Sequence, residues 1–187
     1  METELCKLAF KYGTDKCPKI FHTYTPVYYE LLKHGKESFK KVLELGIGTF
    51  YTMRHVDGYL PGASLRMWRD FFPNAHVYGV DISEEAMFEE DRITTFLMNT
   101  RSEEDMQKLV KTIGSNIDLV VDDGPHDSTS QIRTALMLLP LLDKGVIYII
   151  EDVKATRRVM KHLHEYSPEL KMLERTSRDN SLVIIRK

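Results

Sequence analysis

The 187-residue sequence predicts an α/β fold: a doubly wound, mostly parallel sheet of about seven strands with helices on both faces. Short apolar runs typical of strands alternate with helical patterns over most of the chain. Glycines or acidic residues directly follow several of these runs. Because ligands bind beyond the carboxyl ends of the strands in such sheets, we expect one functional site along that edge.

Composition is that of an ordinary globular domain, with 42% apolar residues and a formal net charge of −2. No basic arm or stripe favours a nucleic-acid partner, and no apolar run is long enough to span a bilayer. Cys6 and Cys17 are predicted to be free thiols, since no secretion signal precedes them. We expect a cytoplasmic protein of one domain, with a helical cap or lid over residues 1–39 and a core over residues 40–187.

Two short helices are predicted in the N-terminal cap. The first covers residues 2–11, with apolar side chains on one face. The second has Thr25 as its N-cap and Pro26 at its first position, continues over Val27–His34 and ends at Gly35.

The segment between these helices is rich in tyrosine and histidine. Tyr24, Tyr28 and Tyr29 fit a packing role against the sheet. The Tyr12–Lys16 turn and the residues His22–Tyr24 are better candidates for a lid over a ligand.

The first predicted strand, Lys40–Leu45, runs into Gly46 and Gly48. Glycine there lets the backbone approach a ligand closely, although any tight exit from a strand also favours glycine. Residues 49–61 then precede a helix that ends at Phe72, and a loop of that length is usually functional. We predict an active-site loop, whose aromatic and methionine side chains fit either a pocket wall or a contact within a homo-oligomer.

The second predicted strand covers residues 75–81 and ends in Asp81. A carboxylate at this place can accept both hydroxyls of a ribose, as in dinucleotide-binding folds. The alternative is that Asp81, together with Ser83, caps a short acidic helix predicted over Ser83–Glu90, and both uses are compatible.

The third predicted strand covers residues 92–98, and Asn99-Thr100-Arg101 at its exit is a place where an adenine could rest. The next helix begins after Ser102 as N-cap, with Asp105 in the capping-box position, and continues to Ile113.

The strongest chemical signal is a pair of acidic strand ends. The apolar run Ile117–Val121 leads into a Gly-Pro turn, and Val146–Ile150 ends in a second acidic pair. If these strands are parallel neighbours, four carboxylates and a histidine meet at one sheet edge: Asp122, Asp123, Glu151, Asp152 and His126.

Between and after these strands, three further elements are predicted. Ser128 or Thr129 caps a helix that extends through Leu142, with a core face formed by Ile132, Ala135, Leu136, Leu138 and Leu139. A basic amphipathic helix is predicted over Lys154–Tyr166. The strands Leu170–Arg175 and Ser181–Arg186 are predicted to form a terminal antiparallel hairpin.

Taken together, these motifs resemble the class I S-adenosylmethionine-dependent methyltransferases, which have a Rossmann-like sheet. Glu44–Gly48 is similar to their first motif, and Val80-Asp81 is similar to their ribose-binding acid. More narrowly, the chain resembles the metal-dependent O-methyltransferases of macrolide sugars, of the mycinamicin and macrocin type. Four pieces in the same order carry this narrower match: Tyr12–Lys16, Gly62–Trp68, Asp122–His126 and Ile150–Asp152.

The resemblance implies that Asp123, Glu151 and Asp152 hold Mg²⁺ and that His126 is the general base, with Asp123 also part of the catalytic centre. Pro125 is a departure, since these enzymes often have serine there. The residues expected to bind S-adenosylmethionine are Tyr12, Thr14, Lys16, Glu44, Gly46, Gly48, Ser64, Asp81, Ile82, Thr100, Arg101 and Asp122. For Asp122, a structural role facing a backbone turn is an open alternative.

Elementary chemistry supports a metal independently. Three clustered carboxylates repel one another, so one would be protonated unless a cation were present. A divalent cation lowers the pKa of a bound hydroxyl, and a histidine can then accept its proton. The expected acceptor is a sugar or another hydroxyl-bearing small molecule.

Three other interpretations remain open. Glu151 and Asp152 could merely cap the following helix. A nicotinamide-dependent oxidoreductase is a second enzymatic interpretation, against which the missing third glycine of the dinucleotide fingerprint argues. A non-catalytic binding module that retains a methyltransferase-like fold is the third.

Overall fold

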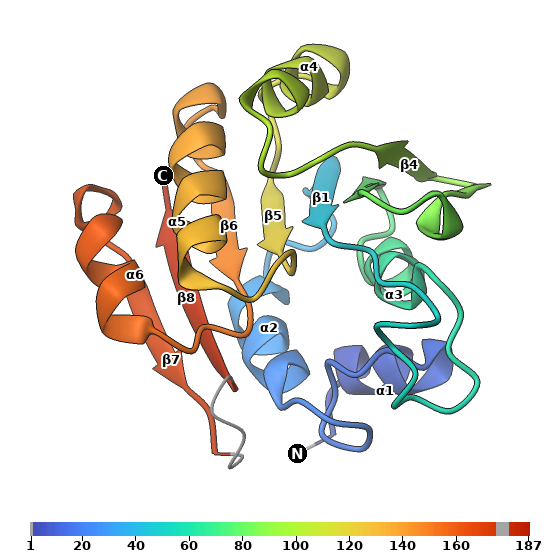
Figure 1. Ribbon diagram of the computed structural model, residues 1–187. Helices are drawn as coiled ribbons and strands as arrows, with labels where there is room; N and C mark the ends of the chain where they lie inside the picture. The colour runs from blue at the N-terminus through green and yellow to red at the C-terminus, as the bar shows by residue number, and fades with distance from the viewer. Residues whose placement is uncertain (1, 175–179) are drawn as a thin grey trace.

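A computed structural model of the chain describes residues 2–174 and 180–187 and has a single eight-stranded sheet between two layers of helices (Figure 1). The strands are β1 Lys41–Leu45, β2 His76–Asp81, β3 Glu89–Glu90, β4 Ile93–Leu97, β5 Leu119–Asp122, β6 Ile147–Ile150, β7 Glu169–Met172 and β8 Ser181–Arg186. Their order across the sheet is β3-β4-β2-β1-β5-β6-β8-β7.

The central strands β4, β2, β1, β5 and β6 are parallel, whereas β3 at one edge and β8 and β7 at the other are antiparallel to their neighbours. The predicted doubly wound sheet with a terminal antiparallel hairpin is therefore confirmed. The register pairs Leu45 with Asp122 and Asp122 with Ile150. Consequently β1, β5 and β6 end side by side, and the residues that follow them meet at one edge.

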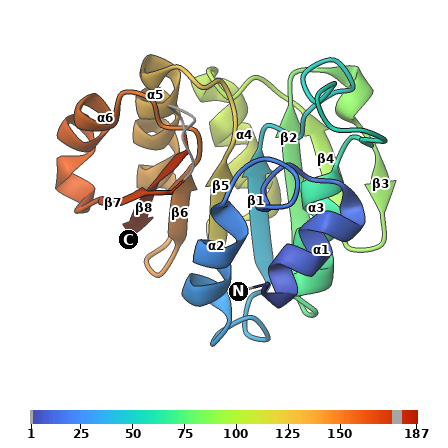
Figure 2. The same ribbon diagram turned by 90° about the horizontal axis from the view of Figure 1, so that it is seen from below.

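The two helical layers use alternate residues of the same strands. The helices are α1 Glu4–Tyr12, α2 Tyr24–Leu32, α3 Ala63–Phe71, α4 Glu103–Ile113, α5 Ser128–Leu138 and α6 Thr156–His162. Figure 2 shows α1, α2 and α3 on one face of the sheet and α4, α5 and α6 on the other. Val42 of β1 packs in the first layer with Tyr28 and Trp68, while Leu43 and Leu45 pack in the second. Such burial on both faces explains why the strands are continuous apolar runs.

Several predicted helix boundaries are wrong. The structure starts α2 at Tyr24 with Thr23 as N-cap, so Thr25 lies inside the helix and Pro26 occupies its third position. Proline is tolerated there because the first-turn N–H groups have no partner within the helix. The N-cap of α5 is Asp127, whose carboxylate accepts from the Ser130 backbone, rather than Ser128 or Thr129.

The short helix predicted over Ser83–Glu90 is also wrong. Only a 3₁₀ turn, Glu84–Ala86, forms there, and β3 follows as an edge strand. The Thr95 hydroxyl of β4 accepts from the Phe88 amide and donates to its carbonyl, so pairing with a neighbouring strand replaces the helix.

The helix α4 has its predicted N-cap, Ser102, and its predicted end at Ile113, whereas α5 and α6 are shorter than predicted. A 3₁₀ turn at Leu139–Leu141 follows α5, and Leu136 is 42% exposed rather than in the core. The basic helix predicted over Lys154–Tyr166 is α6 followed by the 3₁₀ turn His164–Tyr166. Of the predicted strand Leu170–Arg175, the end at Arg175 lies outside the described residues. Within the described ranges, no helix has the length and apolar character needed to cross a membrane.

Candidate active site

A cavity of about 840 Å³ opens at the carboxyl ends of the parallel strands. Its walls come from the segment before α2, the turns after β1, β2, β4 and β5, and the loop over 49–61. Nine predicted cofactor residues line it: Thr14, Lys16, Gly46, Gly48, Ser64, Asp81, Ile82, Thr100 and Arg101. Asp123, His126 and Asp152 also line it, so the cavity joins the predicted cofactor residues to the predicted catalytic ones.

The turn after β1 requires glycine at two positions. Gly46 has φ +90°, and a Cβ placed on it would lie 2.1 Å from the carbonyl oxygen of Asp123. Gly48 has φ +84°, and a Cβ there would lie 2.7 Å from the Tyr59 hydroxyl. Both the backbone conformation and the space exclude a side chain, so this turn forms a bare backbone floor for the cavity.

Asp81, at the end of β2, holds this floor in place. One carboxylate oxygen accepts from the amides of Ile47 (2.9 Å) and Gly48 (3.2 Å), and the other accepts from Ser83 (3.0 Å). Asp81 thus bonds to the Ser83 amide, although the helix that it was expected to cap is absent. Because Asp81 also lines the cavity, its predicted bond to a ribose remains compatible with this geometry.

The loop over 49–61 forms one wall of the cavity, as the sequence predicted for an active-site loop. Five of its residues line the cavity: Thr49, Thr52, Met53, His55 and Tyr59. The Tyr59 hydroxyl donates to the Ile47 carbonyl at 2.8 Å, and the Phe50 amide donates to Glu85 at 2.9 Å. These bonds tie the loop to the turns after β1 and β2.

Two carboxylates and one imidazole form a compact group at the far end of the cavity. Asp123 follows β5, Asp152 follows β6, and His126 lies in the turn between β5 and α5. One potential ligand atom from each residue lies within 4.8 Å of the others. The His126 Nε2 atom is 3.3 Å from Asp123 Oδ1 and 3.5 Å from Asp152 Oδ2. Carboxylate oxygens that converge in this way suit a small divalent cation.

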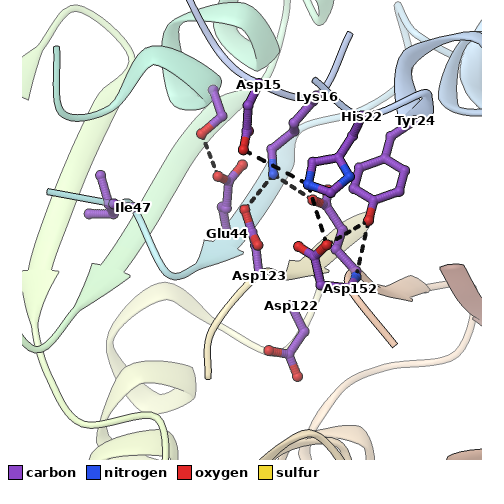
Figure 3. Close-up of polar contacts among 12 residues, drawn as sticks. Asp15, Lys16, His22, Tyr24, Glu44, Ile47, Asp122, Asp123 and Asp152 are labelled. Carbon is purple, nitrogen blue, oxygen red and sulfur yellow. Dashed lines mark hydrogen bonds and ion pairs between the residues drawn. The ribbon is translucent and has the colours of Figure 1, made fainter. Parts of the chain in front are cut away.

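Glu151, the third predicted metal ligand, is not a member of this group. Its carboxylate accepts from the ammonium of Lys16 at 2.7 Å and from the hydroxyl of Tyr28. The same ammonium donates to Asp123 at 2.5 Å, and the Tyr24 hydroxyl donates to Asp152 at 2.8 Å. Figure 3 shows Lys16 and Tyr24 pointing from the N-terminal segment toward the carboxylates of Asp123 and Asp152, respectively.

Charge and burial shift the pKa values of these groups in opposite directions. Burial raises the pKa of Asp123, but the Lys16 ammonium and His126 outweigh it and lower that pKa to about 2. Burial, reinforced by Asp123 and Asp152, raises the pKa of Glu151 well above its usual range, against the effect of Lys16. Burial lowers the pKa of His126, but its bond to Asp123 and both aspartate charges raise it to about 9. With only these neighbours, His126 is therefore protonated at neutral pH.

Three residues predicted to bind the cofactor do not line the cavity. Tyr12 donates its hydroxyl to Asp70. The Glu44 carboxylate is buried and accepts from the Ser64 hydroxyl and the Trp68 indole, the latter at 2.5 Å. Asp122 is 3% exposed and accepts from the Tyr148 hydroxyl at 2.9 Å. Figure 3 shows Asp122 pointing away from the carboxylates around Lys16, so its structural alternative is the one that fits.

The buried Asp122 makes stability depend on pH. Burial, opposed by the bond from Tyr148, raises the pKa of Asp122 from 3.8 to about 7. The pKa of Asp122 is higher in the folded protein than in the unfolded chain. Its contribution to the free energy of unfolding is therefore complete below pH 3.8 and is lost as pH rises through 7. Because Asp122→Asn has no carboxyl group to ionise, its free energy of unfolding should rise by about 2–4 kcal/mol relative to that of wild type over this pH range. Urea unfolding at a series of pH values measures this difference, with the exposed Asp143→Asn as control; parallel curves for all three proteins would contradict it.

His22 and His55 both line the cavity, although no catalytic role was predicted for either from the sequence. The His22 Nε2 atom lies 3.4 Å from Asp152, and the ring stacks on Tyr24. His55 Nε2 lies 3.4 Å from Asp15. For His22 the signal in the sequence was the density of tyrosine and histidine between the first two helices, which predicted a lid. For His55 it was the length of the loop over 49–61, which predicted an active-site loop. Neither signal identified the contacts.

The FtsJ-like methyltransferase family matches residues 29–187. A 2'-O-methyltransferase of 8-demethyl-8-alpha-L-rhamnosyl tetracenomycin-C from Streptomyces olivaceus is 33% identical over 152 residues, which are 81% of this chain and 38% of that protein. Mycinamicin VI 2''-O-methyltransferase from Micromonospora griseorubida is 32% identical over 80% of this chain and 36% of its own length. The chain thus spans little more than a third of the length of these curated relatives.

A solved structure with a similar fold is MycE, a methyltransferase of the mycinamycin biosynthetic pathway in complex with Mg, SAH and mycinamycin VI. The TM-score is 0.79 at 23% sequence identity, over 98% of this chain and 54% of that one. At this identity the likeness concerns the fold, and it matches the sheet and helical layers described above.

Proposed function

Because this chain belongs to the FtsJ-like methyltransferase family, we propose that it transfers a methyl group from S-adenosylmethionine to a hydroxyl of a sugar or other small-molecule glycoside, with a divalent cation. The observation that carries this proposal is one cavity that joins a glycine floor to the group of Asp123, His126 and Asp152. Such a cavity can hold the methyl donor and the acceptor hydroxyl side by side, which is the alignment that an in-line displacement needs.

The cavity fits the cofactor in size and in donor chemistry. A volume of about 840 Å³ is within the range of cofactor sites. Gly46 and Gly48 leave bare backbone beneath it, and Asp81 at the end of β2 suits ribose hydroxyls. Thr100 and Arg101, after β4, border the part of the cavity where we place the adenine.

Asp123 and Asp152 fit a hard divalent cation, for which we propose Mg²⁺, because their oxygens converge from two adjacent strand ends. When bound, the cation would lower the pKa of the acceptor hydroxyl, orient it and offset the carboxylate charges that hold the proton on His126. Mg²⁺ commonly uses one or two carboxylates and keeps places for water and substrate, so this small ligand set is sufficient.

Within this site, His126 is the group that accepts the proton of the acceptor hydroxyl. Its side chain is 43% exposed at the cavity, so an acceptor can reach Nε2. Asp123 lies 3.3 Å from the same nitrogen and favours a proton there, so Nε2 can accept the proton of the hydroxyl only when the charge of the Asp123 carboxylate is offset. Tyr24 fixes Asp152, donating its hydroxyl to the carboxylate while accepting from the Asp152 amide at 3.3 Å.

A sugar hydroxyl is proposed as acceptor because the curated relatives are named as O-methyltransferases of a rhamnosyl tetracenomycin and of mycinamicin VI. The open wall of the cavity carries His22, His55 and the 44%-exposed Phe21, which suit a ring with hydroxyls and an apolar face. The nicotinamide and binding-module interpretations have no comparable support from the residues of the cavity.

Methyl transfer from ¹³C-labelled S-adenosylmethionine to a panel of rhamnosylated and macrolide glycosides tests the proposal. We expect a new methoxy signal by NMR with Mg²⁺, and its loss with EDTA or in Asp152→Asn. Asp143→Asn, an exposed aspartate before β6, is the matched control and should retain transfer. Undiminished transfer after complete removal of metal would rule out the metal-dependent route.

A further inference from the structure

We propose that Arg101 is a positioning residue for the base His126, an inference that rests on the proposed function. Arg101 follows β4 and borders the cofactor end of the cavity, whereas His126 lies in the turn after β5. Asp127 links the two, because it binds the guanidinium of Arg101 and is the next residue after His126. The pair of Arg101 and Asp127 thus fixes where the imidazole lies relative to the acceptor hydroxyl.

The turn that carries His126 has little support from its own backbone. Pro125 has no N–H group, and among the described residues neither the Pro125 nor the His126 backbone is hydrogen-bonded to another backbone group. The Gly124 amide makes only a long contact with the Asp122 carboxylate, at 3.4 Å. Side chains must therefore hold this turn in place.

Three side chains form a closed hydrogen-bond network at the end of the turn. The Asp127 carboxylate accepts from the Ser130 hydroxyl at 2.6 Å and from the Arg101 guanidinium at 3.0 Å. The Nε–H group of Arg101 donates to the same hydroxyl at 2.8 Å. Because each of the three residues bonds to the other two, the network fixes Asp127, and with it the neighbouring His126 backbone, relative to Arg101.

Arg101 is itself anchored on a well-held turn. Its amide donates to the Asn99 side chain at 3.0 Å, and the Asn99 amide donates to Asp105 of α4 at 2.8 Å. The carbonyl oxygen of Thr100 accepts from the hydroxyl of Thr134 in α5 at 3.3 Å. The guanidinium therefore connects the cofactor end of the cavity with the base from a fixed position.

This network should matter more for geometry than for stability. The side chains of Arg101 and Asp127 are 52% and 53% exposed, and an exposed ion pair contributes little to folding because water screens its charges. In Asp127→Asn the amide oxygen still caps α5, since asparagine and aspartate are equally good N-caps. Its NH₂ group cannot accept a hydrogen bond, so an asparagine that caps the helix loses the bonds from Arg101 and from the Ser130 hydroxyl. Asp127 is not among the residues that line the cavity, so this variant leaves the cofactor contacts intact.

Steady-state methyl transfer by wild type, Arg101→Met, Asp127→Asn and the double variant tests this role. The acceptor is the glycoside of the rhamnosylated and macrolide panel that wild type methylates fastest. We expect Asp127→Asn to lower kcat about tenfold, because displacement of a catalytic group by about 1 Å can cost ~10²-fold in rate. The KM for S-adenosylmethionine should change less than about twofold. Since both single variants break the same link, the double variant should have a kcat within about twofold of Arg101→Met.

A second measurement requires no cofactor, metal or acceptor. Relaxation of ¹⁵N nuclei gives the order parameter of the His126 amide, which is about 0.85 for a rigid backbone. In Asp127→Asn it should fall to about 0.7 or below, while the midpoint of thermal unfolding stays within about 4 °C of wild type.

Glu169→Gln is the matched control for both measurements. Glu169 pairs with Arg186 at 3.1 Å with its side chain 41% exposed, and it lies in β7 at the edge of the sheet. Loss of this second exposed ion pair should change neither kcat nor the order parameter of His126.

Two results would overturn the inference. The first is a kcat in Asp127→Asn that equals that of wild type. The second is a loss of kcat accompanied by an equal loss of cofactor affinity or by unfolding more than about 10 °C below wild type, since Asp127 would then act on the cavity or on the whole fold. If wild type methylates no glycoside of the panel, the proposed function fails separately, and an unchanged order parameter in Asp127→Asn would still show that Arg101 does not hold the turn.

Discussion

His126→Ala should lower kcat for methyl transfer by roughly 10²–10⁴-fold, because it removes the group that accepts the hydroxyl proton. His126 is an imidazole of the cavity that lies near both candidate metal ligands, 3.3 Å from Asp123 and 3.5 Å from Asp152. Since it does not belong to the glycine floor, the affinity for S-adenosylmethionine should stay within about threefold of wild type.

Single-turnover kinetics with saturating cofactor and metal measure this loss, and calorimetry with S-adenosylhomocysteine measures cofactor binding. His34→Ala is the matched control, since His34 is exposed after the end of α2. A variant that lacks the His126 imidazole yet retains the wild-type kcat would show that another group, or water, accepts the proton.

Gly46→Ala should both destabilise the protein by more than about 3 kcal/mol and abolish measurable cofactor binding. A methyl group at this position would lie 2.1 Å from the Asp123 carbonyl and 3.0 Å from Gly124 Cα. Neither contact can be relieved by rotation of a side chain, so the turns after β1 and β5 must separate. That movement displaces the cavity floor and Asp123 together.

Gly145→Ala provides the matched control for this prediction. Gly145 has φ +96°, similar to Gly46, but a Cβ there would meet nothing within 4 Å. Gly145→Ala should therefore lower the free energy of unfolding only by the strain of the left-handed backbone, about 1–2 kcal/mol, and leave cofactor binding unchanged. Equal losses of stability in the two variants, measured by urea unfolding, would show that backbone strain rather than the contact with Asp123 decides the cost.

The sheet could be predicted because each of its central strands leaves the same pattern in a short stretch of sequence. Strands buried on both faces must be apolar runs, as in β1, β5 and β6, and the chain order fixes which ends are neighbours. The placement of Asp123 and Asp152 at one edge followed from this alone. The prediction of a helix over Ser83–Glu90 is wrong because hydrogen bonds between Phe88 and Thr95 of β4 override the helical pattern of the sequence.

The partners of the candidate site residues could not be predicted, since they depend on contacts between distant parts of the chain. Lys16 was expected to contact the cofactor, whereas its ammonium binds Asp123 and Glu151, 107 and 135 residues away. Asp122 and Asp123 are adjacent in sequence, but β5 directs them to opposite sides, toward Tyr148 and toward Lys16. The strand ends indicated which edge of the sheet carries the candidate site, but not which carboxylate points into the cavity.

The resemblance to methyltransferases of macrolide sugars is confirmed by the family match and by the curated relatives. Those relatives are more than twice as long as the matched region, so the acceptor and any additional parts of its binding site remain proposals. The cytoplasmic location and the possible homo-oligomer likewise remain predictions from the sequence.

An anomalous-difference map from crystals grown with S-adenosylhomocysteine and Mn²⁺ tests the metal centre beside the cofactor cavity most directly. We expect one strong peak within about 2.5 Å of carboxylate oxygens of Asp123 and Asp152, with cofactor density over Gly46 and Gly48. A cavity filled with S-adenosylhomocysteine but without a peak at these two carboxylates would contradict the proposed metal-dependent transfer.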